Sequence, residues 1–343
     1  MYKDYKTKAL EYCIGKTYSK PVDQEAEEAD EGLHPSWRAP PVVRTLRWDV
    51  LFSLYFCHFR RAAPLLFRQL RAEVYHIDEE YYQEQFTKPL KPVSGLGFSG
   101  SVFFFTRNKD YIVKSIGRRF EYMFLYEELL DPLADYVKHN QDTLLSGITD
   151  VLYSFDYRLG GSLGISPSHF IVMRNNLTRL DKELGCKKWD LKPPGFFEPT
   201  RDLVPDIIKP DAAKSGLADE MDEEIILARK RKADLMSLLE RDTEFLMRKE
   251  IIDYSLLLGR YPVDMFGEVP QPESFLTGVR SGDGKWIYKM CILDFLWNVK
   301  QLHPKIIQAA GTALPEQTIT TQPHRYRNEF LMMMDGYIKV HER

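Results

Sequence analysis

The spacing of apolar residues divides the chain into helices and strands. Helical spacing recurs in five stretches, and the first of these opens with proline in its first turn. The expected helices cover residues 64–71, 79–86, 120–137, 223–251 and 325–340. Short apolar runs, several of them rich in β-branched and aromatic residues, predict strands at residues 102–106, 111–115, 150–157, 169–174, 187–192 and 286–295. Residues 107–110 join the first two strands as a hairpin turn.

These elements predict three parts of the chain, and 343 residues are enough for two folded lobes. Residues 1–37 form an acidic segment, which we expect to be flexible because residues 20–37 hold six acidic side chains and almost no apolar ones. Residues 38–176 are expected to form a lobe with a small sheet and a helix. Residues 177–343 are expected to form a second lobe around a long helix.

Composition and charge narrow the class of protein. Apolar residues make up 44% and charged residues 28%, as in a globular protein, and the net charge is −3. Such a chain is not expected to bind nucleic acid, and contact with an anionic membrane would need a local basic patch. The four cysteines, Cys13, Cys57, Cys186 and Cys291, form no Cys-x-x-Cys pair, which argues against a zinc site and favours a reducing compartment. We find no secretory signal and no apolar run of spanning length, so we expect a cytoplasmic protein, peripheral to a membrane.

A glycine-studded stretch and the strands after it supply the first candidate chemistry. Gly95, Gly97 and Gly100 precede a strand, so they fit a kinase-type flap over phosphates better than a dinucleotide fingerprint or a Walker loop. Lys114 lies on the second strand, where it can face a cleft while its β-branched neighbours pack on the other side. Glu121 follows in the next helix and could pair with Lys114. Taken singly, these residues are better interpreted as an ordinary glycine turn, a solvent-facing edge lysine and a surface glutamate.

Two aspartates enclosed by aliphatic residues supply the second candidate chemistry. Asp253 lies in Ile251-Ile-Asp-Tyr-Ser-Leu-Leu-Leu-Gly259, and Asp294 lies in Cys291-Ile-Leu-Asp-Phe-Leu-Trp297. A carboxylate in apolar surroundings is costly unless a cation or hydrogen bonds meet it. The pair is therefore suited to base and Mg²⁺ duty in phosphoryl transfer. For either residue alone, a structural carboxylate that caps a turn is the alternative.

Other basic residues have weaker claims to function. The run Arg229-Lys-Arg-Lys232 is interpreted as the solvated face of a helix. Four arginines early in the chain could form a membrane-facing patch, although a solvated face is again the favoured interpretation: Arg60, Arg61, Arg68 and Arg71. His303 has no partner at metal-ligand spacing, and a surface position is expected for it.

Taken together, these residues resemble the phosphatidylinositol phosphate kinases, over residues 50–340. The most specific stretch runs from Arg241-Asp-Thr-Glu-Phe-Leu246 to Ile252-Asp-Tyr-Ser-Leu-Leu257, and it is similar to the family's Arg-Asp-x-x-Phe-Leu…Met-Asp-Tyr-Ser-Leu-Leu signature. Further similar segments are Pro64-Leu-Leu-Phe-Arg-Gln-Leu-Arg71, Ser99-Gly-Ser-Val-Phe-Phe-Phe105 with Ile112-Val-Lys114, Asp190-Leu-Lys192, Ile292-Leu-Asp294, and Thr318-Ile-Thr followed by Arg325-Tyr326 and Phe330.

The resemblance implies an α+β, bilobal kinase-like fold with an antiparallel sheet and helices in each lobe. It also implies transfer of the γ-phosphate of ATP, with Mg²⁺, to an inositol ring hydroxyl of a phosphoinositide in a membrane, and it leaves a homodimer open. The implied roles are phosphate contacts for Lys114 and Lys192, orientation of Lys114 by Glu121, catalysis by Asp253, Mg²⁺ ligation by Asp294, and an adenine hinge of Met173, Arg174, Asn175 and Asn176.

Two departures from the family pattern keep other functions open. Pro193-Pro194 follow Lys192 where the family has Gly-Ser, which fixes the backbone and removes a hydrogen-bond donor. The specificity segment after Asp294 carries Lys300, His303 and Lys305 in place of a lysine pair, which would grip a phosphate. From the resemblance as a whole, we expect a phosphatidylinositol phosphate kinase. The alternatives are a catalytically impaired member that senses nucleotide or acts as a scaffold, and a soluble inositol-phosphate kinase.

Overall fold

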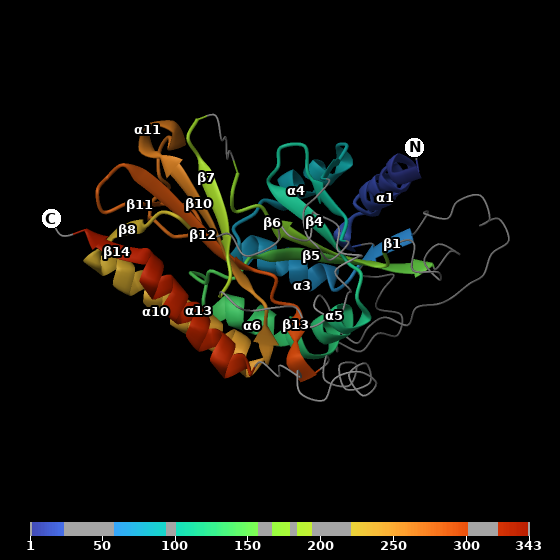
Figure 1. Cartoon of the computed structure of the whole chain (residues 1–343). Helices are drawn as coiled ribbons and strands as arrows, with labels where there is room; N and C mark the ends of the chain where they lie inside the picture. Colours follow the sequence, from blue (N-terminus) through green and yellow to red (C-terminus); the bar gives the residue numbers. More distant parts are fainter. Residues whose placement is uncertain are drawn as a thin grey trace. The chain divides into compact units, whose positions relative to one another are not determined.

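The computed structural model describes residues 2–23, 58–93, 101–156, 167–178, 184–193, 221–300 and 322–341. Within these ranges the chain combines helices with mainly antiparallel sheets, as the α+β prediction requires (Figure 1). The chain divides into two compact units. The first comprises Met1–Gln141 and Gly147–Asn175, and the second comprises Asp142–Ser146 and Asn176–Arg343.

A six-stranded antiparallel sheet forms the centre of the first unit. Its strands are β1 (His58–Arg61), β2 (Lys91–Val93), β3 (Phe103–Phe105), β4 (Tyr111–Ile116), β5 (Ile148–Asp156) and β6 (His169–Arg174), in the spatial order β1-β5-β6-β4-β3-β2. Its helical elements are α1 (Tyr2–Thr17), α3 (Pro64–Gln69), η2 (Leu70–Val74), α4 (Glu79–Thr87), α5 (Arg119–Phe124), η3 (Leu125–Leu129) and α6 (Leu130–His139). The η elements are single π-helical turns: η2 ends the helical run that α3 begins, and η3 lies between α5 and α6. The predicted β3–β4 hairpin and the predicted helix over residues 120–137 are both confirmed.

The amino-terminal helix α1 corrects a sequence prediction. The flexible segment expected over residues 1–37 is wrong for residues 2–17, which form this helix. Leu10 and Ile14 lie one turn apart and are fully buried, and Tyr18 after the helix end stacks on Phe86 with 4.0 Å between ring centroids. The short apolar pattern of α1 is easily overlooked beside the acidic run that follows. Residues 24–57, which hold most of that run, lie outside the described ranges.

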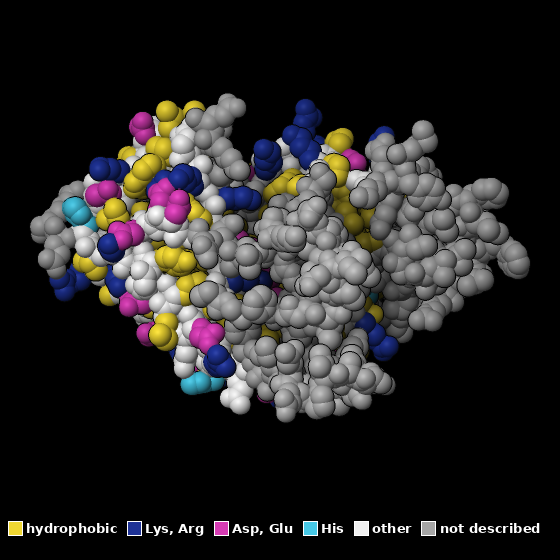
Figure 2. Space-filling view, viewed as in Figure 1, with side chains coloured by type: hydrophobic (Ala, Val, Ile, Leu, Met, Phe, Trp, Pro, Cys, Tyr) yellow, Lys and Arg dark blue, Asp and Glu magenta, His cyan; other side chains and the backbone are white. Residues whose placement is uncertain are grey.

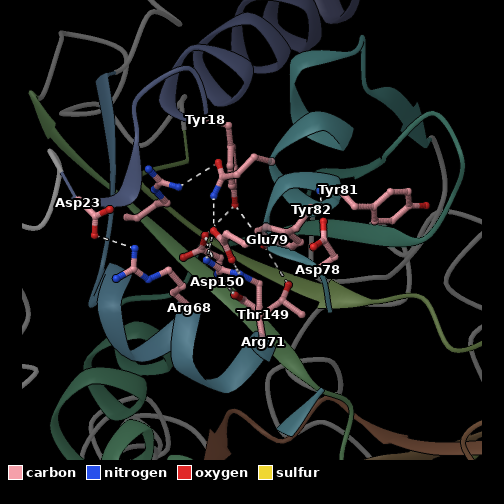
Figure 3. A network of polar contacts seen from close by, with 12 residues as sticks. Tyr18, Asp23, Arg68, Arg71, Asp78, Glu79, Tyr81, Tyr82, Thr149 and Asp150 are labelled. Carbon is pink, nitrogen blue, oxygen red and sulfur yellow. Dashed lines mark hydrogen bonds and ion pairs between the residues drawn. The ribbon is translucent and has the colours of Figure 1, made fainter. Parts of the chain in front are cut away.

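A buried polar network ties α1 to the rest of the first unit (Figure 3). The Tyr18 hydroxyl donates to the Asp150 carboxylate on β5 at 3.1 Å. The Arg71 guanidinium of η2 lies 3.5 Å from the same carboxylate, and it donates two hydrogen bonds to Glu79 at 2.7 Å each. Arg71 and Asp150 are both fully buried, so protein groups must satisfy their charges in place of water.

The arginine patch considered as a membrane-facing surface is not formed by all four residues. Arg61 is buried at 2% exposure and donates to the Gln83 side chain and the Lys20 carbonyl, and Arg71 belongs to the network above. Arg68 on the surface of α3 pairs with Asp23 at 2.7 Å. Residues that look like a solvated face in the sequence are therefore partly buried structural cations.

Because of His169 on β6, we expect the stability of the first unit to be sensitive to acid. Its ring stacks on Tyr122 with 4.0 Å between centroids, and burial lowers its pKa to about 4 from an ordinary value of about 6.5. Between these two values the unfolded chain takes up a proton that the folded chain excludes. Stability should therefore fall as the pH drops from 6.5 towards 4, by up to about 1.4 kcal/mol per pH unit.

Melting temperatures measured between pH 7 and pH 4 test this expectation. His169→Phe keeps an aromatic ring and removes the titration, so its melting temperature should depend less steeply on pH than that of the wild type. His139→Phe, at an exposed histidine of α6, should leave the steep dependence in place. An unchanged slope in His169→Phe would contradict the assignment of the effect to His169.

The second unit is built on a four-stranded antiparallel sheet. Its strands are β7 (Lys187–Leu191), β10 (Ser255–Pro262), β11 (Val279–Arg280) and β12 (Trp286–Leu293), in the order β11-β12-β10-β7. Two further pairs are β9 (Ile251–Ile252) with β13 (Trp297–Asn298), which is antiparallel, and β8 (Ile225–Ala228) with β14 (Ile338–His341), which is parallel. The helices are α10 (Arg229–Arg248), α11 (Val263–Phe266) and α13 (Pro323–Tyr337). Helices α10 and α13 pack side by side (Figure 1).

The long predicted helix begins later than expected. Residues 225–228 form β8 because Ile225 and Leu227 alternate into the core, at 0% exposure, while the strand pairs with β14 near the end of the chain. The basic run at the start of α10 is also more than a solvated face. Arg231 pairs with Glu273 at 2.8 Å, and Lys232 pairs with Asp335 at 2.7 Å.

The described surface of the second unit carries charges of both signs. On the face shown in Figure 2, Lys and Arg side chains are interspersed with Asp and Glu, as expected for a chain with a small net charge. Cys186 and Cys291 are buried in the second unit, and Cys13 is buried in the first. Among the helices that the structure describes, none has both the length and the apolar character needed to cross a bilayer.

Candidate active site

Three of the predicted site residues follow or precede adjacent strands of the second unit. Lys192 comes directly after β7, Asp294 comes directly after β12, and Asp253 lies in the short link between β9 and β10. Strand β10 lies between β7 and β12, and its first residue, Ser255, is opposite Leu293 at the end of β12. Because neighbouring strands are antiparallel, the start of β10 and the ends of β7 and β12 lie at the same end of the sheet.

An ion pair joins two of these residues. The Lys192 ammonium donates to Asp253 Oδ1 at 3.0 Å, and the two side chains are 25% and 18% exposed. Burial alone would lower the pKa of Lys192, but the carboxylates of Asp253, Asp294 and Asp190 outweigh burial and raise it above its ordinary value. Lys192 therefore stays a cation at neutral pH, and both side chains of the pair keep part of their surface exposed.

Both aspartates have a left-handed backbone. The φ angle is 65° at Asp253 and 60° at Asp294, and it is 54° at Glu250 in the turn before β9. Such angles are uncommon for residues with a β-carbon, although Asp tolerates them better than most. Three of the six non-glycine residues with positive φ in the described ranges thus lie around this site. Backbone of this kind persists where the surrounding structure holds it, often at functional sites.

The β9–β13 pair supports the turns that carry the aspartates. Ile252 is opposite Trp297, and the Asn298 side chain donates to the Lys249 carbonyl at 2.8 Å. Lys300, the first lysine of the predicted specificity segment, pairs with Glu250 at 2.6 Å. The other two residues of that prediction, His303 and Lys305, lie outside the described ranges.

Lys114 and Glu121 belong to the first unit. Lys114 on β4 is half-buried opposite Phe103, with its ammonium 5.7 Å from the centroid of that ring, while Val113 is fully buried on the other face. The Glu121 carboxylate accepts a hydrogen bond from the Arg118 backbone amide at 3.3 Å. The predicted Lys114–Glu121 pair stays a prediction. The three flap glycines, Gly95, Gly97 and Gly100, lie outside the described ranges.

The predicted adenine hinge lies where the two units divide. Met173 and Arg174 end β6, Asn175 is the last residue of the first unit, and Asn176 opens the main part of the second. The Asn175 side chain donates to the Lys109 carbonyl at 2.7 Å, so it is anchored on the β3–β4 turn. The adenine role of these four residues stays a prediction.

Sequence reasoning assigned no role to two residues near the Lys192–Asp253 pair, although both lie in segments that resemble the family. Asp190 on β7 adds a carboxylate that raises the pKa of Lys192, and its place in the Asp-x-Lys motif could have revealed it. Tyr326 on α13 donates its hydroxyl to the Tyr254 carbonyl, 72 residues earlier in the chain. No local pattern signals that contact, because it depends on how α13 folds back.

Part of the most specific signature turns out to be structural. Asp242 on α10 is fully buried and accepts a hydrogen bond from the Leu144 amide at 2.6 Å. Its neighbour Arg241 pairs with Asp142 at 2.8 Å. These contacts hold the short segment Asp142–Ser146 against the rest of the second unit.

The donor set suits a Mg²⁺ ion that is completed by substrate. Among the residues that the structure describes, no three or more His, Cys, Asp and Glu side chains form a metal cage. Mg²⁺ at phosphate-transfer sites commonly takes one or two carboxylates and fills its remaining positions with water and substrate phosphates. Asp190, Asp253 and Asp294 outnumber the Lys192 ammonium, so these four side chains together are anionic and offer oxygen ligands.

A family model described as Phosphatidylinositol-4-phosphate 5-Kinase matches residues 84–268, just over half of the chain. The matched span includes Lys114, Lys192 and Asp253, whereas Asp294 follows it.

Three relatives show the same likeness. Phosphatidylinositol 4-phosphate 5-kinase type-1 sktl of Drosophila melanogaster is 28% identical over 64% of this chain and 26% of its own length. Phosphatidylinositol 4-phosphate 5-kinase of Plasmodium falciparum is 24% identical over 82% of this chain and 18% of its own length. Phosphatidylinositol 5-phosphate 4-kinase type-2 gamma of Danio rerio is 28% identical over 60% of this chain and 46% of its own length. The chain thus spans less than half of each relative, and on the strength of the family match it belongs to the phosphatidylinositol phosphate kinase family.

Proposed function

We propose that the chain is a phosphoinositide kinase that transfers the γ-phosphate of ATP to an inositol ring hydroxyl of a phosphatidylinositol phosphate, in peripheral contact with a membrane. The observation that carries this proposal is the half-buried Lys192–Asp253 pair, which lies beside Asp294 at one end of the four-stranded sheet. The chain's membership of the family gives this pair its interpretation. The relatives are named as kinases of phosphatidylinositol 4-phosphate or 5-phosphate, which supports the same class of acceptor.

Asp253 and Lys192 have complementary parts in the proposed reaction. The Asp253 carboxylate orients the ring hydroxyl and takes its proton as the ring oxygen attacks the γ-phosphorus. The new oxygen–phosphorus bond forms as the bond between the γ-phosphorus and the bridging oxygen breaks, which leaves ADP and a lipid with one more phosphate. The Lys192 ammonium, held as a cation by its carboxylate neighbours, stabilises the charge on the transferring phosphoryl oxygens.

Asp294 is the proposed ligand of Mg²⁺, and Lys114 keeps its predicted role in holding the nucleotide phosphates. When bound, Mg²⁺ neutralises charge on the nucleotide phosphates. The three aspartates around Lys192 would repel ATP in the absence of Mg²⁺, so both the site and the nucleotide require the cation for binding.

ATP binding should therefore depend on Mg²⁺. We expect the affinity for ATP to fall by about tenfold or more, about 1.4 kcal/mol, when EDTA replaces Mg²⁺. Asp294→Asn should lose most of this dependence, because it removes one anion and one ligand together. Isothermal titration calorimetry with and without Mg²⁺ measures both effects. Equal affinities in the two conditions for the wild type would contradict the assigned role of Asp294.

The acceptor is tested by following labelled γ-phosphate. Vesicles that carry phosphatidylinositol 3-phosphate, 4-phosphate or 5-phosphate are compared with water-soluble inositol phosphates. Label in at least one lipid is the expected result. Label in the soluble compounds alone would favour a soluble inositol-phosphate kinase. Stabilisation by ATP without any transfer would favour the catalytically impaired alternative. The physical reason for considering that alternative is that proline fixes the backbone after Lys192.

A further inference from the structure

Helix α13 reaches the candidate site through one buried hydroxyl. Tyr326 in the first turn of α13 is fully buried, and its hydroxyl donates to the Tyr254 carbonyl. The Tyr326 ring packs edge-on against the Tyr254 ring with 4.7 Å between centroids, and Phe330 packs against Tyr254 at 5.1 Å. Tyr254 directly follows Asp253, and its carbonyl belongs to the peptide bond between Tyr254 and Ser255, so α13 holds the chain one residue beyond the candidate catalytic aspartate.

The backbone conformation at Asp253 decides where its carboxylate lies. The left-handed φ of 65° at Asp253 is unfavourable for a residue with a β-carbon, so an unsupported turn would relax towards other conformations. Such a rotation would carry the Tyr254 carbonyl away from Tyr326 and the Asp253 carboxylate away from Lys192. The turn is thus held twice, through the backbone by Tyr326 and through the side chain by Lys192 at 3.0 Å.

Packing of the Tyr254 ring alone does not fix the Tyr254–Ser255 peptide in the same way. The Tyr254 hydroxyl is buried and has no hydrogen-bond partner within the described part of the chain, so its ring is held by aromatic contacts. Aromatic contacts tolerate small rotations of the ring, whereas a hydrogen bond to the carbonyl has a direction. The Tyr326 hydroxyl is therefore the group that restricts the orientation of the Tyr254–Ser255 peptide, through which the chain passes from Asp253 into β10.

We propose that Tyr326 is a positioning residue of this site. Its hydroxyl keeps the Asp253 turn in the left-handed conformation in which the carboxylate meets Lys192. The expected effect on turnover rests on the proposed kinase function, whereas the effect on the Lys192–Asp253 contact does not.

Tyr326→Phe removes the hydroxyl and keeps the ring, and Tyr261 offers a matched control. Tyr261 stands at the other end of β10 from Asp253, is 2% exposed, and donates its hydroxyl to the Thr178 carbonyl at 3.2 Å. Tyr261→Phe therefore removes a partly buried tyrosine-to-carbonyl hydrogen bond from the same unit. Phe330→Leu is a second control, because it loosens the packing of α13 on Tyr254 and leaves the Tyr326 hydroxyl in place.

The first measurement does not need catalysis. The full chain is treated with limiting acetic anhydride, and acetylation of Lys192 is compared with that of the exposed Lys285 by mass spectrometry. Because a neutral amine reacts and an ammonium does not, the carboxylate partner slows acetylation of Lys192. Tyr326→Phe should raise the Lys192 to Lys285 ratio by about threefold or more, because a displaced Asp253 carboxylate no longer holds the pKa of Lys192 as high. Tyr261→Phe and Phe330→Leu should leave the ratio unchanged.

The second measurement is the rate of lipid phosphorylation. Tyr326→Phe should lower kcat by about tenfold and change the KM for ATP little. The reason is that the misplaced group is the Asp253 carboxylate, which takes the proton of the ring hydroxyl during transfer. Tyr261→Phe should leave both values near those of the wild type, while both variants lower the melting temperature by similar amounts.

The outcomes separate the inference from the proposed function. An unchanged acetylation ratio in Tyr326→Phe would overturn the positioning role, whether or not the chain is a kinase. A raised ratio in Phe330→Leu as well would assign the effect to packing rather than to the hydroxyl, and would also overturn it. A wild type that transfers no phosphate, with the acetylation change intact, would defeat the proposed function and leave the positioning of Asp253 supported.

Discussion

Arg71→Met is expected to lower the stability of the first unit by about 3–5 kcal/mol. The guanidinium is fully buried, donates to Glu79 and to the Thr149 carbonyl, and lies over the Tyr82 ring at 4.3 Å. Methionine would fill much of the space, but it would leave the Asp150 carboxylate charged in a buried site with the Tyr18 hydroxyl as a remaining partner. Hydrogen-exchange mass spectrometry on peptides from α1 and β5 would report the loss locally.

Arg68→Met is the matched control, because it makes the same substitution one turn earlier at an exposed ion pair with Asp23. Exposed pairs contribute about 0–1 kcal/mol, so exchange in α1 and β5 should stay close to that of the wild type. The double variant Arg71→Met with Asp150→Asn should recover part of the loss, since the uncompensated buried charge is gone. Equal effects of Arg71→Met and Arg68→Met would show that the network contributes little.

Asp253→Asn is expected to reduce the turnover number by about 10²–10⁴-fold and to leave the fold intact. The amide cannot take the proton of the ring hydroxyl, whereas asparagine tolerates a left-handed backbone at least as well as aspartate does. The substitution therefore removes the charge without straining the turn. Steady-state kinetics on vesicles would measure turnover, and a thermal melt would verify the fold.

Asp264→Asn on α11 is the corresponding control, because it removes an exposed carboxylate elsewhere in the second unit. Its turnover should match that of the wild type. If Asp253→Asn retained full turnover, Asp253 could not be the group that takes the proton. If it lowered the melting temperature far more than Asp264→Asn does, a structural carboxylate would be the better description of Asp253.

Local patterns in the sequence predicted much of the fold. The β3–β4 hairpin, β6 and α4 are confirmed, because alternating or helical spacing over a few residues is enough to specify each of them. Elements that depend on distant partners were missed or misplaced. Residues 225–228 form a strand in place of a helix start because they pair with β14, and α1 is folded because Leu10 and Ile14 meet a core built from later residues.

The candidate site was predictable to a similar degree. Asp253 and Asp294 were found because a carboxylate within an apolar run needs an explanation. Their left-handed backbone and the β7–β10 register that brings Lys192 beside Asp253 are properties of the folded sheet, with no signature of their own in the sequence. Arg71 was misjudged for a related reason: an arginine on a helix is usually exposed, and its burial follows from Glu79 and Asp150 around it.

The central claim is that Lys192, Asp253 and Asp294 form a site that transfers phosphate to a lipid. Its most direct test is the radioactivity recovered in the organic extract after vesicles of mixed monophosphorylated phosphatidylinositols meet the protein with γ-labelled ATP and Mg²⁺. We predict label in the lipid at roughly one hundred times or more the level given by Asp253→Asn, and its loss when EDTA is present. Label at the same level with the wild type and with Asp253→Asn would contradict the account.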